Sequence, residues 1–162
     1  MGFVPEDRLQ DALVPEFSLA ENVALLGAGA ARGRVAWDSV ASRAERILAE
    51  FDVRAPGVDV RADALSGGNQ QKFVLGRELG AAATALVVEN PTRGLDILAT
   101  AYVLTAIRRA AHAGRAAIVF HSSDVEEVTA IADRVFVCFE GQVREVASGD
   151  HDAVTRAMVG AA

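Results

Sequence analysis

The chain has 162 residues, enough for one domain with a buried core of its own. Its formal net charge of −6 gives no positive field for a phosphate backbone, so we expect no nucleic-acid partner. No apolar stretch approaches the roughly 20 residues of a bilayer-crossing helix, and the amino terminus has no signal-peptide pattern, which predicts a soluble chain. The single cysteine, Cys138, excludes a disulfide scaffold, and its apolar surroundings predict a buried, reduced thiol in a cytosolic protein.

The first half of the chain has the pattern of helices joined by loops. Ser18, with Glu21 three residues later, matches a capping box and predicts a short helix that begins after Ser18. Apolar residues recur at helical spacing from Ala36 to Phe51 and predict a helix with one buried stripe. A third helix is predicted from Ser66 to about Leu79.

From residue 83 onward, short apolar strands alternate with helices. The strand "TALVVEN" precedes a turn, a helix from Asp96 to about His112 whose buried stripe includes Ile97, and a second apolar strand in "AAIVFH". This order of strand, helix and strand predicts a parallel, buried pair and hence an α/β fold. A helix over about 124–132, two strands that turn at Gly141, and a last helix from about His151 complete the chain.

The segment "LSGGNQQK" places two glycines at a predicted helix start. The first amides of a helix have no partner within it, and the helix dipole makes this end attractive to anions. Ser66 could cap the helix or donate to an anion, while Gly67 and Gly68 carry no side chain that would hold a phosphate away. The alternative is an ordinary capped helix in which the glycines only serve the turn, and this segment by itself leaves both interpretations open.

The wider pattern resembles the ATP-binding cassette (ABC) ATPases. "LSGGNQQK" resembles their signature sequence, in the form found in importers of simple sugars and related compounds, and "ALVVENPTRGLDI" resembles the Walker B strand and D-loop. "VPEDR" near the amino terminus is similar to the Q-loop segment of the second cassette in tandem sugar-importer ATPases. No G-x-x-x-x-G-K-[ST] motif occurs in these residues, so the resemblance implies the carboxy-terminal portion of a cassette, without the Walker A half.

The resemblance also implies two parts. Residues 1–82 would form the Q-loop-like segment and the α-helical signature subdomain. Residues 83–162 would form the second half of the RecA-like α/β core, with Walker B, the D-loop and the switch region.

Several catalytic positions of the family are altered here. Glu89 and Asn90 stand where the family has the Asp that orients magnesium-bound water and the Glu that polarises the attacking water. Glu89 keeps a carboxylate, which could act on the metal through water or cap the next turn, whereas Asn90 cannot accept a proton. Ser123 falls at the switch position, with His121 two residues earlier either near nucleotide or simply packed at the strand end. Glu6 is nearest the Q-loop glutamine and is a candidate metal contact through water, so we expect a degenerate site and an inactive isolated chain.

The signature positions, in contrast, match the family. They are Ser66, Gly67, Gly68, Asn69 and Gln70. In the family each nucleotide lies between the phosphate loop of one cassette and the signature helix of another, which implies that these residues bind ATP, with Mg²⁺, on a partner cassette. Asp96 would lie at the interface of the pair, cap the following helix, or do both.

The resemblance implies a fragment of the ATP-hydrolysing subunit of an importer for sugars or related small solutes. Its partners would be another cassette and membrane permease subunits, and its location the cytoplasmic face of the cell membrane. Two alternatives stay open: a non-catalytic regulatory or interaction protein derived from a truncated cassette, and a soluble ABC ATPase without a transport role. A complete cassette encoded upstream of residue 1 would favour the importer.

Overall fold

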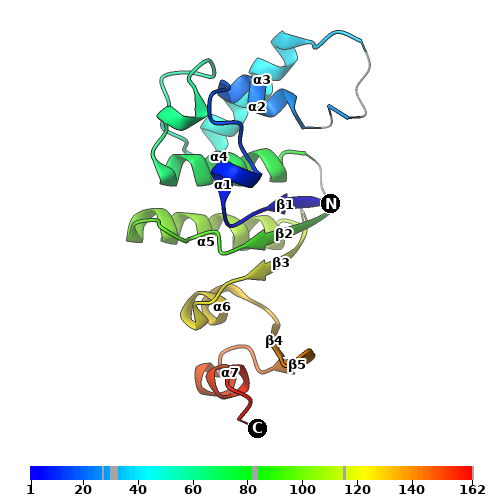
Figure 1. Ribbon diagram of the computed structural model, residues 1–162, viewed down its shortest axis with the longest axis vertical. Helices are drawn as coiled ribbons and strands as arrows, with labels where there is room; N and C mark the ends of the chain where they lie inside the picture. The colour runs from blue at the N-terminus through cyan, green and yellow to red at the C-terminus, as the bar shows by residue number, and fades with distance from the viewer. Residues whose placement is uncertain (27, 30–32, 82–83, 115, 162) are drawn as a thin grey trace. The chain divides into compact units, whose positions relative to one another are not determined.

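The computed structural model describes residues 1–26, 28–29, 33–81, 84–114 and 116–161 (Figure 1). They form two compact units, Met1–Val119 and Phe120–Ala162, and each is described by itself. The division proposed from the sequence, between residues 82 and 83, lies within the first unit, where the helical part gives way to the strands.

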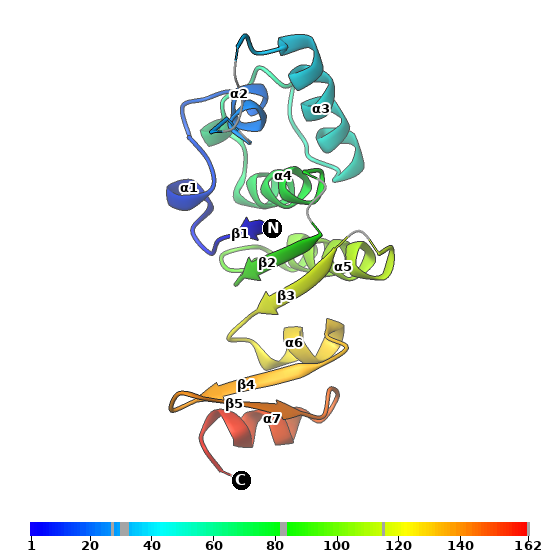
Figure 2. The same ribbon diagram turned by 90° about the vertical axis from the view of Figure 1, so that its right-hand side faces the viewer.

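The first unit is built on a small sheet with the strand order β1-β2-β3, and the boundary with the second unit falls within β3, after Val119. β1 (Gly2–Val4) pairs in parallel with β2 (Ala85–Glu89), and β3 (Ala117–His121) lies along the other side of β2. The arrows of β2 and β3 point the same way in Figure 2, as the predicted α/β arrangement requires. The expected burial is confirmed for β2, where Leu86 and Val88 are fully buried. It is wrong for β3, because this strand lies at the edge of the sheet and Val119 is 65% exposed.

The helix α4 (Gly67–Leu79) occupies the centre of the first unit, and both ribbon views place it between the sheet and the pair α2–α3 (Figures 1 and 2). It packs against β1 and against α5 (Ile97–His112). The fully buried apolar side chains of α4 are Phe73, Val74 and Leu75. The buried stripe of α5 passes through Val103, Ile107 and Ala110, so the expectation that Ile97 is buried is wrong.

The helical part of the first unit follows local sequence signals. Ser18 caps α2 (Leu19–Ala24) in the predicted capping box: the amide of Glu21 donates to Ser18 Oγ at 3.1 Å, and the amide of Ser18 donates to Glu21 Oε2 at 2.7 Å. The predicted amphipathic helix is α3 (Trp37–Glu50). Two short elements complete this part, α1 (Arg8–Asp11) and the 3₁₀ turn η1 (Ala62–Ala64), which leads into α4.

The second unit contains α6 (Val125–Ile131), an antiparallel hairpin, and α7 (His151–Met158). The hairpin strands are β4 (Val135–Phe139) and β5 (Gln142–Val146), and they turn at Gly141, whose φ is +77°. The core consists of Val135, Val137 and Val154. Cys138 is exposed, contrary to expectation, because alternate strand residues point to opposite faces and Val135 and Val137 occupy the core face. Among the described residues, no helix has the length and apolar character needed to span a bilayer.

Candidate functional site

The start of α4 presents unpaired donors to the surface. Ser66 is the exposed N-cap, and its hydroxyl makes no hydrogen bond to the helix backbone. Instead Asn69 Nδ2 donates to Ser66 Oγ at 3.0 Å, while Asn69 Oδ1 accepts from the amide of Arg54 at 2.9 Å. Because Ser66 Oγ accepts from Asn69, its own proton is left to donate outward, beside the first amides of the helix, which have no acceptor within it.

A surface hollow of about 360 Å³ lies at this helix start. It is lined by Ser66, Gly68 and Asn69 from the α4 side and by Asp96 at the start of α5. Four of the residues singled out from the sequence therefore meet at one exposed place. Asp96 also caps α5 as predicted, since its Oδ1 accepts from the amide of Ala99 at 2.8 Å.

A charged and aromatic cluster adjoins the signature residues in the same hollow. Lys72 Nζ lies 3.0 Å from Asp52 Oδ2 and 4.1 Å from the centroid of the Tyr102 ring. The hydrogen bond from Lys72 lowers the pKa of Asp52, and burial, followed by the charge of Asp52, raises the pKa of Tyr102. Sequence reasoning missed this cluster because its members come from the turn after α3, from α4 and from α5.

The two glycines of the signature are explained by close neighbours within the chain. A Cβ at Gly68 would lie 3.1 Å from the Cβ of Ala99, so Gly68 permits the close packing of α4 on α5. A Cβ at Gly67 would lie 2.6 Å from Arg8 Nη2. Close packing on α5 is thus a structural reason for glycine at position 68, beyond the phosphate approach expected from the sequence, whereas at position 67 the neighbour is the movable tip of a long side chain.

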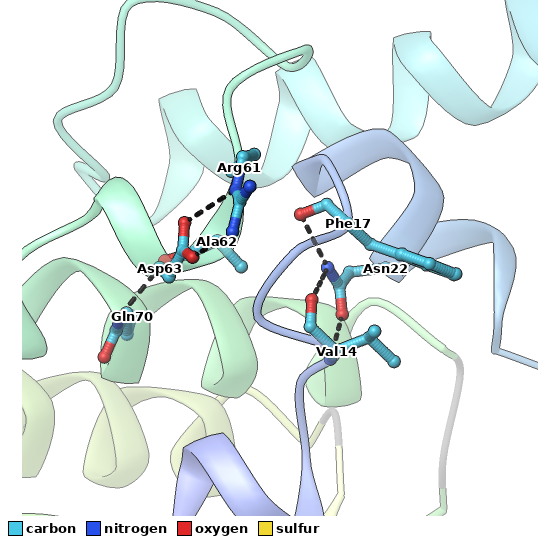
Figure 3. Close-up of polar contacts among 7 residues, drawn as sticks. All are labelled: Val14, Phe17, Asn22, Arg61, Ala62, Asp63 and Gln70. Atoms are coloured by element: carbon cyan, nitrogen blue, oxygen red, sulfur yellow. Dashed lines mark hydrogen bonds and ion pairs between the residues drawn. The ribbon is translucent and has the colours of Figure 1, made fainter.

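Two of the signature residues, Gly67 and Gln70, do not line the hollow. Gln70 points into the protein. It is buried, and its Nε2 donates to the carbonyl of Ala62 at 3.1 Å (Figure 3). Its Oε1 accepts from Arg8 Nε at 3.2 Å. Both ends of the Gln70 amide are therefore used inside the protein, so its contact with nucleotide has no support in this geometry.

The end of β2 brings Glu6 and Asn90 together. Asn90 Nδ2 donates to Glu6 Oε2, and Arg93 Nη1 pairs with Glu6 Oε1. Asn90 has φ +37°, a left-handed conformation that asparagine adopts more readily than glutamate. Glu89 is half-buried at the last position of the strand. In the described ranges no group of three or more His, Cys, Asp or Glu side chains could hold a metal ion, so metal contact by Glu6 or Glu89 stays a proposal.

The predicted switch position lies in the second unit. His121 ends β3, and both His121 and Ser123 are exposed. The turn that contains Ser123 is fixed by its neighbour Ser122, whose Oγ donates to Glu127 Oε2 at 2.9 Å and accepts from the amide of Asp124 at 3.0 Å. These two hydrogen bonds order the turn that leads into α6.

The fold matches solved ATP-binding cassettes. One is the cassette MJ0796 as a dimer in a post-hydrolysis state bound to ADP and Pi, with a TM-score of 0.72, 23% identity, and coverage of 90% of this chain and 61% of that one. A second dimeric structure of MJ0796, a bacterial ABC transporter cassette, gives a TM-score of 0.73 at 23% identity and covers 90% of this chain and 62% of that one. This likeness defines the class of fold, an α/β ATP-binding cassette.

Sequence comparison then gives the homologues. The chain is 38% identical, over 91% of its length, to the nucleoside import ATP-binding protein NupA of Lactococcus lactis subsp. cremoris. It is 40% identical, over 93% of its length, to the ribose import ATP-binding protein RbsA 1 of Burkholderia thailandensis. The homologues of the chain are thus ATP-binding proteins of ABC importers. The chain spans about 30% of the length of these two relatives, and no family model matches it.

Proposed function

We propose that the chain is part of the ATP-binding subunit of an importer for sugars or nucleosides, and that the start of α4 completes a nucleotide site on a partner cassette. The observation that carries this proposal is the hollow that gathers Ser66, Gly68, Asn69 and Asp96 at one exposed place. The importer class is supported by relatives named for nucleoside and ribose import. The paired arrangement is supported by the dimeric form of the similar cassettes.

In this proposal the partner cassette holds ATP and Mg²⁺, and this chain stabilises the terminal phosphate. The Ser66 hydroxyl and the amides of Gly67 and Gly68 would donate to the γ-phosphate, aided by the dipole of α4. Donors fixed before the reaction stabilise the charge that develops in the transition state. Asn69 would act beside them, because its donation to Ser66 Oγ leaves the hydroxyl proton of Ser66 to donate to the phosphate.

The end of β2 supports a degenerate second site. An amide at Asn90 cannot serve as a general base, a role that contributes about 10²- to 10⁴-fold in rate. The carboxylate of Glu6 accepts from Asn90 and pairs with Arg93, so a metal contact through water would compete with these two contacts. Glu89 is the remaining candidate for orienting metal-bound water. We therefore propose that a site using this strand binds nucleotide but hydrolyses it slowly.

The start of α5 suits an interface with the partner cassette. Ile97 and Leu98, which follow Asp96, are 87% and 83% exposed. Large apolar side chains with this exposure are typical of protein contact surfaces. The helical part around α2 and α3 would contact membrane permease subunits, which would hold the assembly at the cytoplasmic face of the membrane.

Ser66→Arg in the complete transporter tests the proposal. The long side chain would fill the hollow and replace the hydroxyl donor, so ATP-dependent uptake should fall about 100-fold. Ser148→Arg, at an exposed position before α7, is the matched control and should leave uptake unchanged. Normal uptake by the Ser66→Arg transporter, assembled at wild-type levels, would contradict a role of α4 in the partner's site.

A further inference from the structure

Arg8 lies against the start of α4, although it precedes Ser66 by 58 positions in the sequence. Its Nε donates to Gln70 Oε1 at 3.2 Å, and its Nη2 occupies the space beside Gly67. The side chain is half-buried, and α1 is fixed at its start by Asp7, which caps the amides of Leu9 and Gln10 at 3.1 Å. The guanidinium is therefore held in place by α1 and faces the first turn of α4.

Gln70 extends this contact to the turn that presents Ser66. Its Nε2 donates to the carbonyl of Ala62, the first residue of η1 (Figure 3). That carbonyl also accepts from the amide of Leu65 at 3.3 Å. The amide of Gln70 donates to the carbonyl of Ser66 at 2.9 Å. Arg8, Gln70 and Ala62 thus form a hydrogen-bonded series that joins α1, the first turn of α4 and the turn just before it.

The glycine at position 67 has two competing explanations. If it were needed so that a phosphate could approach, a Cβ at this position would point into the hollow. The structure directs that Cβ at Arg8 Nη2 instead, at 2.6 Å, whereas the hollow is lined by Ser66, Gly68 and Asn69. An alanine at position 67 would therefore meet and displace the tip of the Arg8 side chain rather than reach into the hollow.

We propose that Arg8 is a positioning residue for the signature helix: it holds Gln70 and Gly67 so that the turn at Ser66 keeps the geometry needed by the partner's nucleotide site. This inference rests on the function proposed for Ser66. Arg8 itself does not line the hollow and acts through Gln70. Loss of Arg8 should misplace the Ser66 hydroxyl, and should lower the rate of the partner's reaction more than its affinity for ATP.

The first experiment uses the 162-residue chain and needs no nucleotide. In Arg8→Gln, the main-chain amide of Gln70 should exchange with solvent about tenfold faster, because the turn that it closes loses its support. Arg46→Gln, which removes an exposed arginine from α3, is the matched control and should leave that rate unchanged. An unchanged rate in Arg8→Gln would overturn the positioning role.

The second experiment measures ATP hydrolysis by the complete transporter. Arg8→Gln should lower kcat about fivefold with KM for ATP changed less than about twofold, since the partner holds the nucleotide. Arg8→Lys should give the same loss, because a single ammonium cannot both donate to Gln70 and cover Gly67. Wild-type kcat in both Arg8 variants would overturn the inference.

A double-mutant cycle decides between the two explanations for Gly67. In the wild type, Gly67→Ala should lower kcat because the new methyl group displaces Arg8. In an Arg8→Ala background, where that space is vacant, Gly67→Ala should lower kcat little further. An equal loss in both backgrounds would favour phosphate approach and overturn the inference. If Ser66→Arg has no effect, the proposed function fails; if Ser66→Arg lowers turnover but the Arg8 variants do not, only this inference fails.

Discussion

At the scale of single residues, the pair Asp52–Lys72 links the turn after α3 to α4. Lys72 Nζ donates to both the carboxylate and the carbonyl of Asp52, each at 3.0 Å, and this hydrogen bond lowers the pKa of Asp52 in the folded chain. A carboxyl whose folded pKa is lowered stabilises the protein above its unfolded pKa, and that stabilisation is lost as the pH falls through the folded value.

Asp52→Asn should therefore lower the urea midpoint at pH 7, and the difference from wild type should shrink as the pH falls below about 3.9, the ordinary value for aspartate. The measurement is a pair of urea unfolding curves at each pH between about 7 and 2. Asp59→Asn, at another exposed aspartate, is the control and should show no such trend. If the urea midpoints of wild type and Asp52→Asn still differ by the same amount at the lowest pH, the ion pair is not the cause of the difference.

The residues of the site differ in how far the sequence could place them. Ser66 and Asp96 both stand at helix starts, as the local sequence predicts. Asp96 caps its helix through its side chain, whereas the Ser66 hydroxyl accepts from Asn69 and makes no capping bond. The burial of Gln70 was not predictable, because it depends on Arg8 and Ala62, which come from other parts of the chain. The same holds for the cluster around Lys72, which exists only once three helical segments have packed.

At the scale of elements, α3 and α4 approach closely at Gly76. A Cβ at this position would lie 2.6 Å from Phe51 Cδ2 and 2.9 Å from Ile47 Cγ2. An alanine inside a helix normally stabilises it by about 1 kcal/mol relative to glycine, but overpacking a core costs about 1–3 kcal/mol. We therefore expect Gly76→Ala to lower the free energy of unfolding by about 1 kcal/mol, against the helix propensity.

Urea unfolding of the purified chain measures this effect. Gly57→Ala is the matched control, because a Cβ there has no neighbour within 4 Å, and it should leave the midpoint unchanged. Phe51→Leu should make room for the new methyl group. In that background, Gly76→Ala should therefore lower the free energy of unfolding by less than it does in the wild type. A Gly76→Ala chain more stable than wild type would mean that α3 and α4 are not packed as described.

The sequence predicts the elements that have strong local patterns well, and the other predictions fail for identifiable physical reasons. The capping box at Ser18 and the extent of α4 are confirmed to within a residue. β1 was missed because three residues are too few for a periodic pattern, and its pairing depends on β2, far along the chain. Ile97 was placed on the wrong side of α5 because periodicity identifies an apolar face without saying which neighbour covers it.

At the scale of the whole molecule, the two units have cores of very different size. The unit Phe120–Ala162 depends on three buried valines, and so small a core gives only marginal stability. Val137→Ala removes part of that core and should destabilise this unit by about 2 kcal/mol. The amides of β4 and β5 should then exchange faster in native-state hydrogen exchange, while the amide of Val88 in β2 keeps its rate.

Val143→Ala is the control for this last prediction. Val143 lies in the same hairpin but is 66% exposed, so its replacement removes little buried surface and should change the exchange rates only slightly. If Val137→Ala instead speeds exchange at Val88 as much as in the hairpin, the chain unfolds as one cooperative body. Exchange that rises only within Phe120–Ala162 would establish that this unit opens separately, so that the turn containing Ser123 can change without disturbing the start of α4.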